Sequence, residues 1–216
     1  EGRGARSTAS PMSGFTITPI TANLLDPVFD LATRVFAASS NLHRALNEDM
    51  TRYSRALRPC FEAMVAQHHS LAALSPDGQV LGCLIATHLE EAFTAPQDTL
   101  APYPQISALT GQLLQTYRTD RPSGVNHTLL VDMAATHPDA RHLGLYSALR
   151  AHIETQARTA GFTFNLGAHS SAITQHVVLS RMGHRKIAEI RFAEFEWNGT
   201  WPFQFITSPP SVVLAE

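Results

Sequence analysis

Cysteine is scarce in this sequence, and neither sign of charge dominates. The 216 residues include two cysteines, Cys60 and Cys83, and the formal net charge at pH 7 is −2. Two cysteines are too few for the disulfide framework of a small secreted protein, and they fit buried thiols in a reducing cytoplasm. The small net charge leaves no positive field that would attract nucleic acid or an anionic membrane. We therefore expect a cytoplasmic protein with neither of those partners.

Long apolar runs and metal-binding motifs are also missing. No apolar stretch approaches the roughly 20 residues that a membrane-spanning helix needs. The eleven histidines include His68, His69, His169 and His176, and none of these four shows an H-E-x-x-H or paired-cysteine spacing. The sequence therefore predicts no metal site. The hydrophobic fraction of 44% and the charged fraction of 16% are typical of a globular protein.

The order of the predicted elements indicates an α/β fold with a mixed sheet flanked by helices, and not a doubly wound parallel sheet. Strands are predicted at residues 15–20, 71–74, 79–88, 125–135, 162–168, 186–196 and, as an edge strand, 212–214. Helices are predicted at residues 23–38 with a cap at Asn23 or Asp26, 47–69 with a break near Pro59, 106–117, 141–160, and from Ser171 or Thr174 to 183.

Two segments stand apart from this pattern. Residues 1–13 lack periodicity, and we interpret them as a disordered tail or as residues added ahead of a natural start at Met12. Residues 14–216 are then expected to form a single domain. The connection at residues 89–122 is longer than usual, which is typical of a segment that contacts substrate or forms a lid.

The most informative stretch runs from Asn126 to Gly161. An almost wholly apolar strand carries one carboxylate, Asp132, and is broken by Pro138, which has no amide donor. A helix is predicted after Arg141, with Gly144 in its first turn. The first turn of a helix has unpaired N–H groups and binds phosphate well, and a glycine there lets a ligand approach closely. The sequence thus predicts an anion site where this strand leads into a helix.

The residues of this junction, THPDARHLGLYSAL, resemble the acyl-CoA loop of the GNAT acetyltransferase superfamily, V-x-P-x-x-R-x-x-G-x-G/A. Pro138, Arg141 and Gly144 match the pattern, whereas Tyr146 replaces the usual final small residue. The C-terminal stretch SRMGHRKIAEIRFAEFEWNGTWPF resembles the klGF-x-x-x-x-ei-x-y-x-dy-x-x-x-G-x-x-pF pattern of the arylalkylamine and dopamine N-acetyltransferases. The matching residues are Gly183, Ile187, Glu189, Ile190, Phe192, Glu194, Phe195, Gly199, Pro202 and Phe203.

The resemblance implies a GNAT-like fold and a reaction in which acetyl-CoA, as co-substrate, acetylates a small primary amine, arylalkylamine-like, by direct attack. It also implies a monomer or homodimer. Main-chain groups of the strand would pair with pantetheine, a backbone N–H near Ala134 would polarise the acetyl carbonyl, and the helix start would hold the pyrophosphate. The implied cofactor-binding residues are Ala134, Ala135, Thr136, Arg141, His142, Leu143, Gly144, Leu145, Tyr146 and Ser147.

Asp132 is the candidate general base. Alternation along a strand places it on the same face as Ala134 and Thr136, and members of the arylalkylamine branch commonly have a catalytic histidine at this position. A carboxylate in an apolar run tends to have a raised pKa, which suits proton abstraction. The alternative is a structural aspartate that a backbone amide or an arginine satisfies. Ser180 is a candidate for binding the leaving thiolate, and the alternative is an ordinary serine on a helix surface.

Two departures from the branch keep other functions open. Ser40 and Asn41 stand where the branch has Glu-Pro, and Leu179 stands where many members have a tyrosine that protonates the thiolate. An acyl-CoA sensor with little catalysis fits these losses. A transferase acting on a protein or peptide N-terminus is a further alternative. An acidic groove would support it, but the sequence has no obvious acidic cluster. Release of free thiol from acetyl-CoA with a panel of amines distinguishes the N-acetyltransferase from the acyl-CoA sensor.

Overall fold

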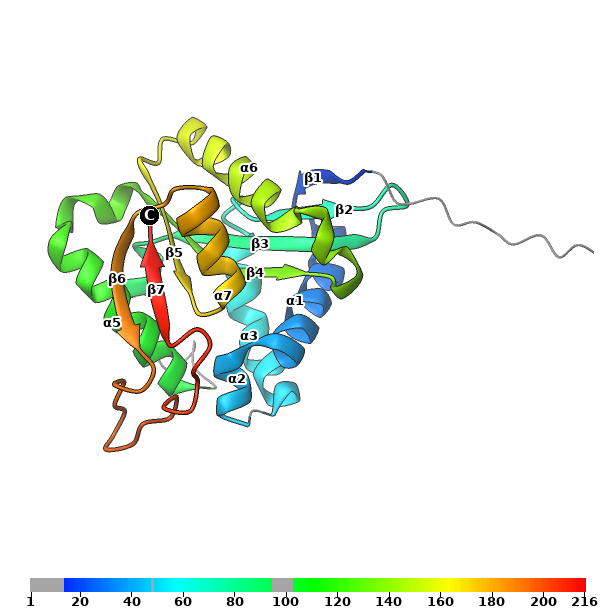
Figure 1. Ribbon diagram of the computed structural model, residues 1–216. Helices are drawn as coiled ribbons and strands as arrows, with labels where there is room; N and C mark the ends of the chain where they lie inside the picture. The colour runs from blue at the N-terminus through cyan, green and yellow to red at the C-terminus, as the bar shows by residue number, and fades with distance from the viewer. Residues whose placement is uncertain (1–13, 48, 95–102) are drawn as a thin grey trace, which may run out of the picture.

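The computed structural model describes residues 14–47, 49–94 and 103–216, and seven strands within them form one sheet (Figure 1). The strand order is β1-β2-β3-β4-β5-β7-β6. Only β4 and β5 pair in parallel, and the other neighbours are antiparallel. The predicted mixed α/β sheet is therefore confirmed, whereas the predicted tail at residues 1–13 lies outside the described residues. The strands are β1 (Thr16–Pro19), β2 (Leu71–Leu74), β3 (Val80–His88), β4 (Thr128–Thr136), β5 (Phe164–His169), β6 (Lys186–Arg191) and β7 (Ser211–Ala215).

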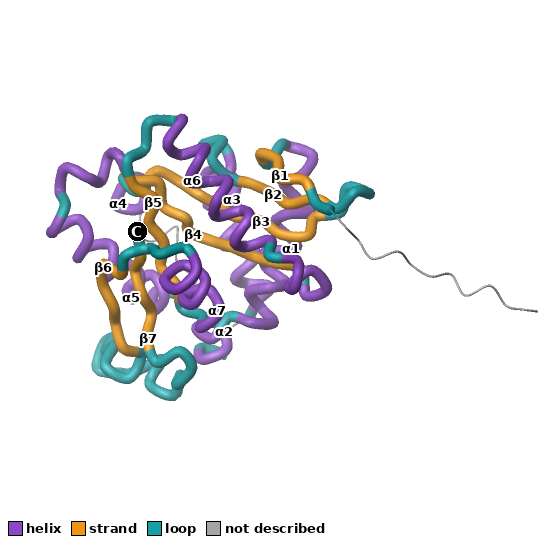
Figure 2. The backbone as a smooth tube through the Cα atoms, turned by 45° about the horizontal axis from the view of Figure 1, so that its top comes forward, coloured by secondary structure: helices purple, strands orange, loops and turns teal. Residues whose placement is uncertain are grey.

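Helices cover both faces of this sheet (Figures 1 and 2). The α-helices are α1 (Leu25–Ser39), α2 (Asn41–Ala45), α3 (Met50–Val65), α4 (Glu91–Thr94), α5 (Pro104–Asp120), α6 (Leu145–Thr159) and α7 (Ala172–Gln175). Short 3-10 segments lie at η1 (Ala22–Leu24), η3 (Pro122–His127) and η4 (Pro138–Leu143), and η5 (His176–Arg181) is a π-helix. No helix among the described residues is long and apolar enough to cross a lipid bilayer.

The buried side chains show which helix covers which face. The apolar side of α6, including Leu149 and Ile153, packs against Leu84 of β3 and Leu129 of β4. The other face of β3 packs with α1 and α3, where Val28 and Phe61 are among the fully buried side chains, as are Cys83 and Ile85. Because consecutive strand residues point to opposite faces, the central strands bury side chains on both sides.

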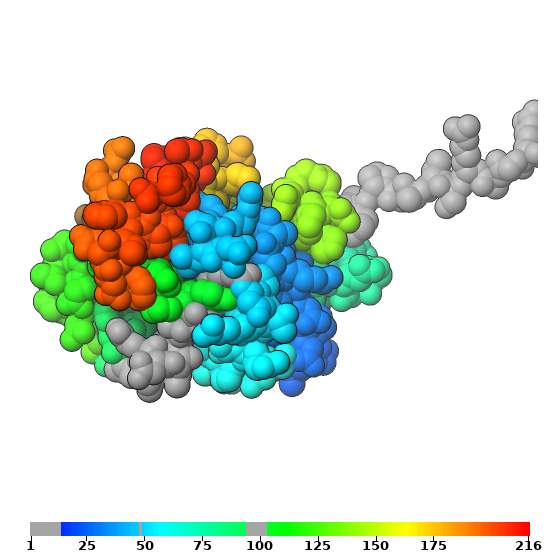
Figure 3. All heavy atoms as spheres, turned by 90° about the horizontal axis from the view of Figure 1, so that it is seen from below, coloured from blue at the N-terminus to red at the C-terminus, as the bar shows by residue number. Residues whose placement is uncertain are grey.

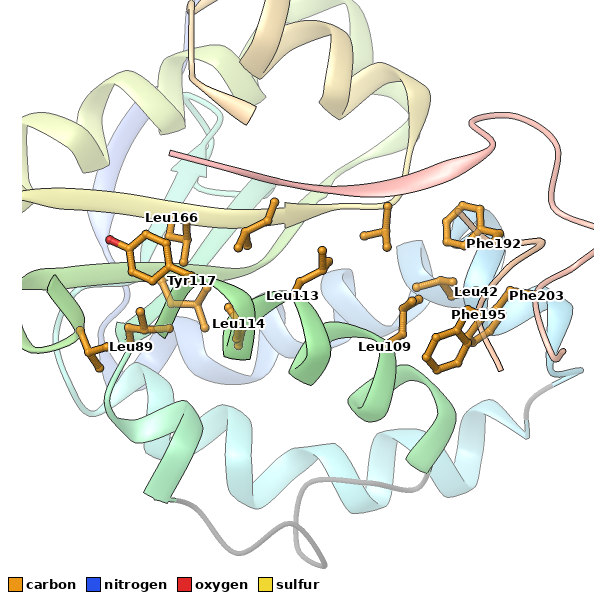
Figure 4. Packing of buried hydrophobic residues seen from close by; sticks show 14 residues of the cluster. Leu42, Leu89, Leu109, Leu113, Leu114, Tyr117, Leu166, Phe192, Phe195 and Phe203 are labelled. Carbon is orange, nitrogen blue, oxygen red and sulfur yellow. The ribbon is translucent and has the colours of Figure 1, made fainter. Parts of the chain in front are cut away.

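A third group of buried side chains joins α5 to the C-terminal strands. Figure 4 shows the α5 side chains between the helix and the sheet, and Leu42 of α2 beside three phenylalanines of the C-terminal segment. The Tyr117 hydroxyl also hydrogen-bonds the Thr128 hydroxyl at 2.9 Å, at the start of β4. The long connection predicted at residues 89–122 thus contains two helices and contributes core, and its residues 95–102 lie outside the described part. Members of the group include Leu42, Leu109, Leu113, Leu114, Tyr117, Leu166, Phe192, Phe195 and Phe203.

Three predicted boundaries are wrong in instructive ways. The helix α3 continues through Pro59 without a break, and its start is capped by Asp49, whose carboxylate accepts hydrogen bonds from the Thr51 and Arg52 amides. Burial of one face of α3 outweighs the backbone hydrogen bond that a proline removes. The helix α1 begins at Leu25 after a 3-10 turn, so no side chain caps it and neither predicted cap acts as one.

The last strand is also placed differently from the prediction. β7 is an interior strand that pairs with β5 on one side and β6 on the other, and all five of its residues are buried. The strand at this edge of the sheet is β6, whose residues are all exposed or half-buried. The run Ser211–Ala215 is apolar except at its first residue, which is typical of a strand covered on both faces.

Candidate active site

Strands β4 and β5 separate partway along their length. The two strands pair from Thr128 with Phe164 to Val131 with Gly167, and no pairing between the described residues of β4 and β5 continues beyond this point. β4 itself remains paired with β3 as far as Thr136. Figure 1 shows the two strands pointing in different directions past the paired region. The outer edge of β4 therefore has free backbone groups that an extended ligand can pair with, as an added strand would.

A β-bulge lies at the same level of β4. Ile85 pairs with Met133 and the next residue, Ala86, pairs with Val131, which leaves Asp132 without a partner on β3. Val131 packs on the α6 side of the sheet, whereas Met133 packs on the side of α1 and α3. Alternation is therefore interrupted at Asp132. Bulges of this kind redirect a side chain and are frequent beside active sites.

The bulge removes the basis for expecting Asp132 on the same face as Ala134 and Thr136. Ala134 pairs with Leu84, whose side chain belongs to the α6 side, and directly opposed residues share a face. The charge of Asp132 instead acts on Cys60 of α3, which lies on the opposite side of the sheet. Asp132 would therefore meet a substrate from the α1 and α3 side of the sheet and not from the side of Ala134.

Asp132 combines access to solvent with a deep position. Its side chain is exposed although it lies in an interior strand, yet desolvation by the surrounding protein raises the pKa of its carboxyl. Among the described residues, none forms a hydrogen bond or an ion pair with it. The structural alternative, in which an amide or an arginine satisfies the aspartate, therefore has no support from the described contacts.

The connection from β4 to α6 differs from the prediction in one respect. Pro138 begins a 3-10 segment that extends to Leu143, and α6 begins only at Leu145. Gly144 is the N-cap residue, with a φ of 70°, and is not part of the first turn as predicted. The amides of His142 and Leu143 thus belong to the 3-10 segment. The helical anion site is shorter than predicted and begins after the glycine.

The first turn of α6 carries amides that no side chain caps. The first backbone bond of the helix runs from the Ala148 amide to the Gly144 carbonyl, and no cap hydrogen bond is made by a side chain. The amides of Leu145, Tyr146 and Ser147 precede that bond, so they have no partner within the helix. Together with the positive end of the helix dipole they form a site suited to an anion. Arg141 is exposed just before it.

The predicted cofactor-binding residues lie along this single connection. Ala134 and Thr136 are half-buried at the free edge of β4, and Ala135 is buried between them. Arg141 and His142 are exposed, Leu143 is half-buried, and Leu145 is buried under the helix start. Ser147 and Tyr146 are half-buried. The strand edge and the helix start thus lie at the two ends of the connection from β4 to α6.

Tyr146 packs against the π-helix η5. Its ring contacts the cluster formed by Val178, Val213 and Ala215, which Leu179 also joins. Burial raises the pKa of Tyr146, with Arg150 opposing the shift. The leucine at the position of the usual tyrosine therefore lies within an apolar cluster shared by α6 and η5.

Ser180, predicted to bind the leaving thiolate, is exposed on η5. Its side chain makes no hydrogen bond with any described residue, and no described contact brings it to Asp132. The π-helical winding places each residue at a different angle from an α-helix, so a face inferred from α-helical spacing does not hold here. Its role remains a prediction.

A second group of residues, at the junction of α1 and α2, lies close to the end of β5. Ser40 caps α2, and its hydroxyl hydrogen-bonds the His43 Nδ1 atom at 2.7 Å. The side-chain amide of Asn41 donates to the Ser170 carbonyl at 2.8 Å, which ties α2 to the end of β5. Figure 3 shows the chain of α2 against the C-terminal segment. The sequence resemblance matches Ser40 and Asn41 with the glutamate and proline of the arylalkylamine branch.

His43 is the member of this group that sequence reasoning missed. Its imidazole is buried, and burial lowers its pKa to about 4, so the ring is neutral at pH 7. The ring contacts Phe36, Tyr53 and Tyr103 edge-on at centroid distances of 5.5, 4.6 and 6.1 Å. The signal available in the sequence was Ser40 followed three residues later by a histidine, which is the spacing of a helix cap and its partner.

A separate cavity lies between α6, β5 and residues 182–184, which follow η5. It has a volume of about 310 Å³, and its lining includes Glu154, Asn165 and His184. None of the predicted site residues borders it. The candidate site thus rests on the free strand edge and the uncapped helix start, and not on this cavity.

The structure is similar to two solved N-acetyltransferases and to one solved condensation domain. A mosquito arylalkylamine N-acetyltransferase like 5b has a TM-score of 0.75 at 15% identity, covering 94% of this chain and 98% of that chain. A Drosophila melanogaster polyamine N-acetyltransferase, which catalyses the formation of N-acetylagmatine, has the same TM-score, identity and coverage. The C-terminal condensation domain of Ebony, in complex with beta-alanyl-dopamine, has a TM-score of 0.76 at 15% identity, covering 94% and 97% of the two chains.

These similarities show that the chain has the fold of these proteins, as the GNAT resemblance implies. No protein-family model matches the chain, and no curated protein matches it by sequence.

Proposed function

We propose that this protein is an acetyl-CoA-dependent N-acetyltransferase that acts on a small primary amine. The observation that carries the proposal is the free edge of β4, which starts beside Asp132 and leads through the short segment η4 to the uncapped start of α6. The fold shared with solved N-acetyltransferases supports the same reaction class. One of these proteins is an arylalkylamine N-acetyltransferase and another forms N-acetylagmatine, so arylalkylamines and agmatine are the amines to test first.

Acetyl-CoA fits the residues present on two grounds. The unpaired backbone groups near Ala134 and Ala135 can pair with the amides of an extended arm. The amides of Leu145, Tyr146 and Ser147 would hold a pyrophosphate, with Arg141 adding positive charge. When bound, acetyl-CoA supplies an activated acetyl group. The protein residues hold it still, and such positioning can lower a barrier by about 7–11 kcal/mol in well-oriented cases.

Asp132 would act as the general base. An amine is protonated at neutral pH and must lose a proton before its nitrogen can attack. A carboxylate with a raised pKa that water can reach is suited to accept that proton, directly or through one water molecule. A backbone N–H near Ala134 would stabilise the negative charge that develops on the acetyl oxygen.

A binding protein with little catalysis is the second candidate, and one observation favours it. Leu179 lies in an apolar cluster with Tyr146, and Ser180 is exposed, so neither supplies a clear proton donor for the leaving thiolate. Such a protein would bind acyl-CoA and report its presence to a partner. It would share the strand edge and helix start but would not acetylate amines.

Release of free thiol from acetyl-CoA in the presence of single amines tests the proposal. Phenethylamine-like amines and agmatine are the first acceptors, with a tertiary amine as the matched control that cannot be acetylated stably. Turnover with a primary amine and none with the control is expected. Tight binding of acetyl-CoA without turnover on any amine would favour the second candidate, and failure to bind acetyl-CoA would contradict both.

A further inference from the structure

Two histidines that are distant in sequence face each other at one end of the sheet. His69 lies two residues before the start of β2, and His88 is the last residue of β3. Their Nε2 atoms are 3.2 Å apart. His88 pairs with Leu129 at the start of β4, so the pair lies at the opposite end of this strand from the candidate active site. His88 is exposed and His69 is half-buried, which leaves the pair open to solvent.

The spacing of the two rings matches that of two imidazoles bound to one metal ion. With N–Zn bonds of 2.0–2.1 Å and tetrahedral angles, two ligand nitrogens lie about 3.3 Å apart and their ring centroids about 5.2 Å apart. The observed values are 3.2 Å and 5.1 Å. A head-on N–H···N hydrogen bond of the same length would place the centroids about 5.5 Å apart. The centroids are closer than this, so the rings are tilted from the line that joins the two nitrogens, as they are when two imidazoles bind one ion.

Contacts with the surrounding residues hold the rings on one side and the backbone of both histidines. The Phe162 ring packs edge-on against them, with centroid distances of 5.1 Å to His69 and 4.8 Å to His88. The Gln67 side-chain oxygen accepts a hydrogen bond from the His88 amide at 2.9 Å. The Gln156 side chain on α6 donates to the His69 carbonyl at 3.5 Å. The two imidazoles are thus brought together by the fold before any ion binds, which reduces the cost of ordering them.

We propose that His69 and His88 bind one divalent transition-metal ion, such as Zn²⁺, Ni²⁺ or Cu²⁺. Neutral imidazole is a suitable ligand for these three ions, and affinity usually rises from Zn²⁺ and Ni²⁺ to Cu²⁺. No group of three or more histidine, cysteine or acidic side chains among the described residues can hold a metal ion. Water therefore fills the remaining positions, and the site binds more weakly than a structural zinc site with four protein ligands. The separation of 19 residues between the ligands explains why no sequence motif indicates the site.

Calorimetric titration of the full chain, free of any added histidine tag, tests the proposal with Zn²⁺ and then Ni²⁺ as probes. We compare the wild type with His69→Ala, His88→Ala and His152→Ala, the last being an exposed histidine on α6 that serves as the matched control. The expected result is one ion per chain for the wild type and the control. Each of the other two variants should bind more weakly by at least the roughly 10- to 100-fold that loss of an outer-shell partner costs.

Two further measurements make the result independent of folding. Circular dichroism compares the fold of each variant with the wild type, and His88→Asn replaces His88→Ala if the alanine variant is unfolded. X-ray absorption at the zinc edge should show two imidazole nitrogens at 2.0–2.1 Å. Equal affinity of wild type, His69→Ala and His88→Ala would overturn the proposal, as would an absorption spectrum without imidazole scattering.

Discussion

Replacing Asp132 with asparagine nearly preserves the size of the side chain and removes its negative charge. A general base must be unprotonated to accept a proton, and desolvation raises the pKa of Asp132 above its ordinary value. Activity should therefore be full above this raised pKa and fall as the pH drops through it. Loss of a general base typically costs about 10²- to 10⁴-fold in rate. We expect kcat for Asp132→Asn to fall by an amount in this range and the acidic limb of its pH profile to disappear.

The same substitution has a second readout that does not depend on catalysis. Burial and, to a smaller extent, the charge of Asp132 raise the pKa of the Cys60 thiol to about 11. At about pH 8 such a thiol is ionised in roughly one molecule in a thousand, so it reacts slowly with iodoacetamide. Without the charge the pKa of Cys60 falls. Alkylation should become faster, by less than about tenfold because burial is the larger cause and remains.

The assay follows alkylation by peptide mass spectrometry, with Cys83 as an internal control. Cys83 is fully buried, burial raises its pKa to about 12, and Asp132 is not among the causes. Asp139→Asn, at an exposed carboxylate in η4, controls for a general change of charge. An acidic limb that persists in Asp132→Asn would refute its role as the base. An unchanged rate at Cys60 would refute the position of the carboxylate near α3.

Three other predictions rest on a glycine conformation, on two buried histidines and on one hydrogen bond. Gly144→Val should weaken binding of acetyl-CoA in equilibrium titrations, whereas the control Gly78→Val, in the β2–β3 turn, should not. Both glycines have a positive φ and open space where a Cβ would lie, so both variants should lose about 1–2 kcal/mol of stability. Burial lowers the pKa of His43 to about 4 and of His169 to about 3. The stability that the two neutral imidazoles contribute is therefore complete above about pH 6.5 and is lost as the pH falls toward these values. Urea unfolding should give a lower free energy of unfolding at about pH 5 than at about pH 7, and equal values would contradict the prediction. Asn41→Ala removes the hydrogen bond to the Ser170 carbonyl and should raise KM for the amine more than KM for acetyl-CoA, while Asn23→Ala, in the exposed turn before α1, should change neither.

The sequence predicts those parts of the fold that depend on neighbouring residues. The β2–β3 hairpin is predicted correctly because Ser75-Pro76-Asp77-Gly78 has the residues that a tight turn requires, and Gly78 has a φ of 84° in the structure. The strand, break and helix from Thr128 to Gly161 are also predicted, because an apolar run, a proline and a repeat of apolar residues indicate them in turn. Each of these elements is specified within a few residues of chain.

The predictions fail where partners distant in sequence decide the outcome. The apolar run at the C-terminus shows that β7 is a strand but not that it is inserted between β5 and β6, because pairing depends on residues 20 or more positions away. Local rules also place a break at Pro59, yet the buried side chains of Phe61, Met64 and Val65 keep α3 continuous. In both cases packing outweighs local preference.

The bulge at Asp132 connects this limit of sequence reasoning with the proposed chemistry. Val131 is the last residue of β4 that pairs with β5, and Asp132 is the residue that has no partner on β3. A carboxylate without a partner inside a regular buried strand would be costly. At this position β4 is irregular on one side and free on the other, so water reaches the side chain and the cost is reduced. The apolar residues on either side of Asp132 conceal the bulge from any reading of periodicity, but the aspartate itself indicates that the regular strand is interrupted there.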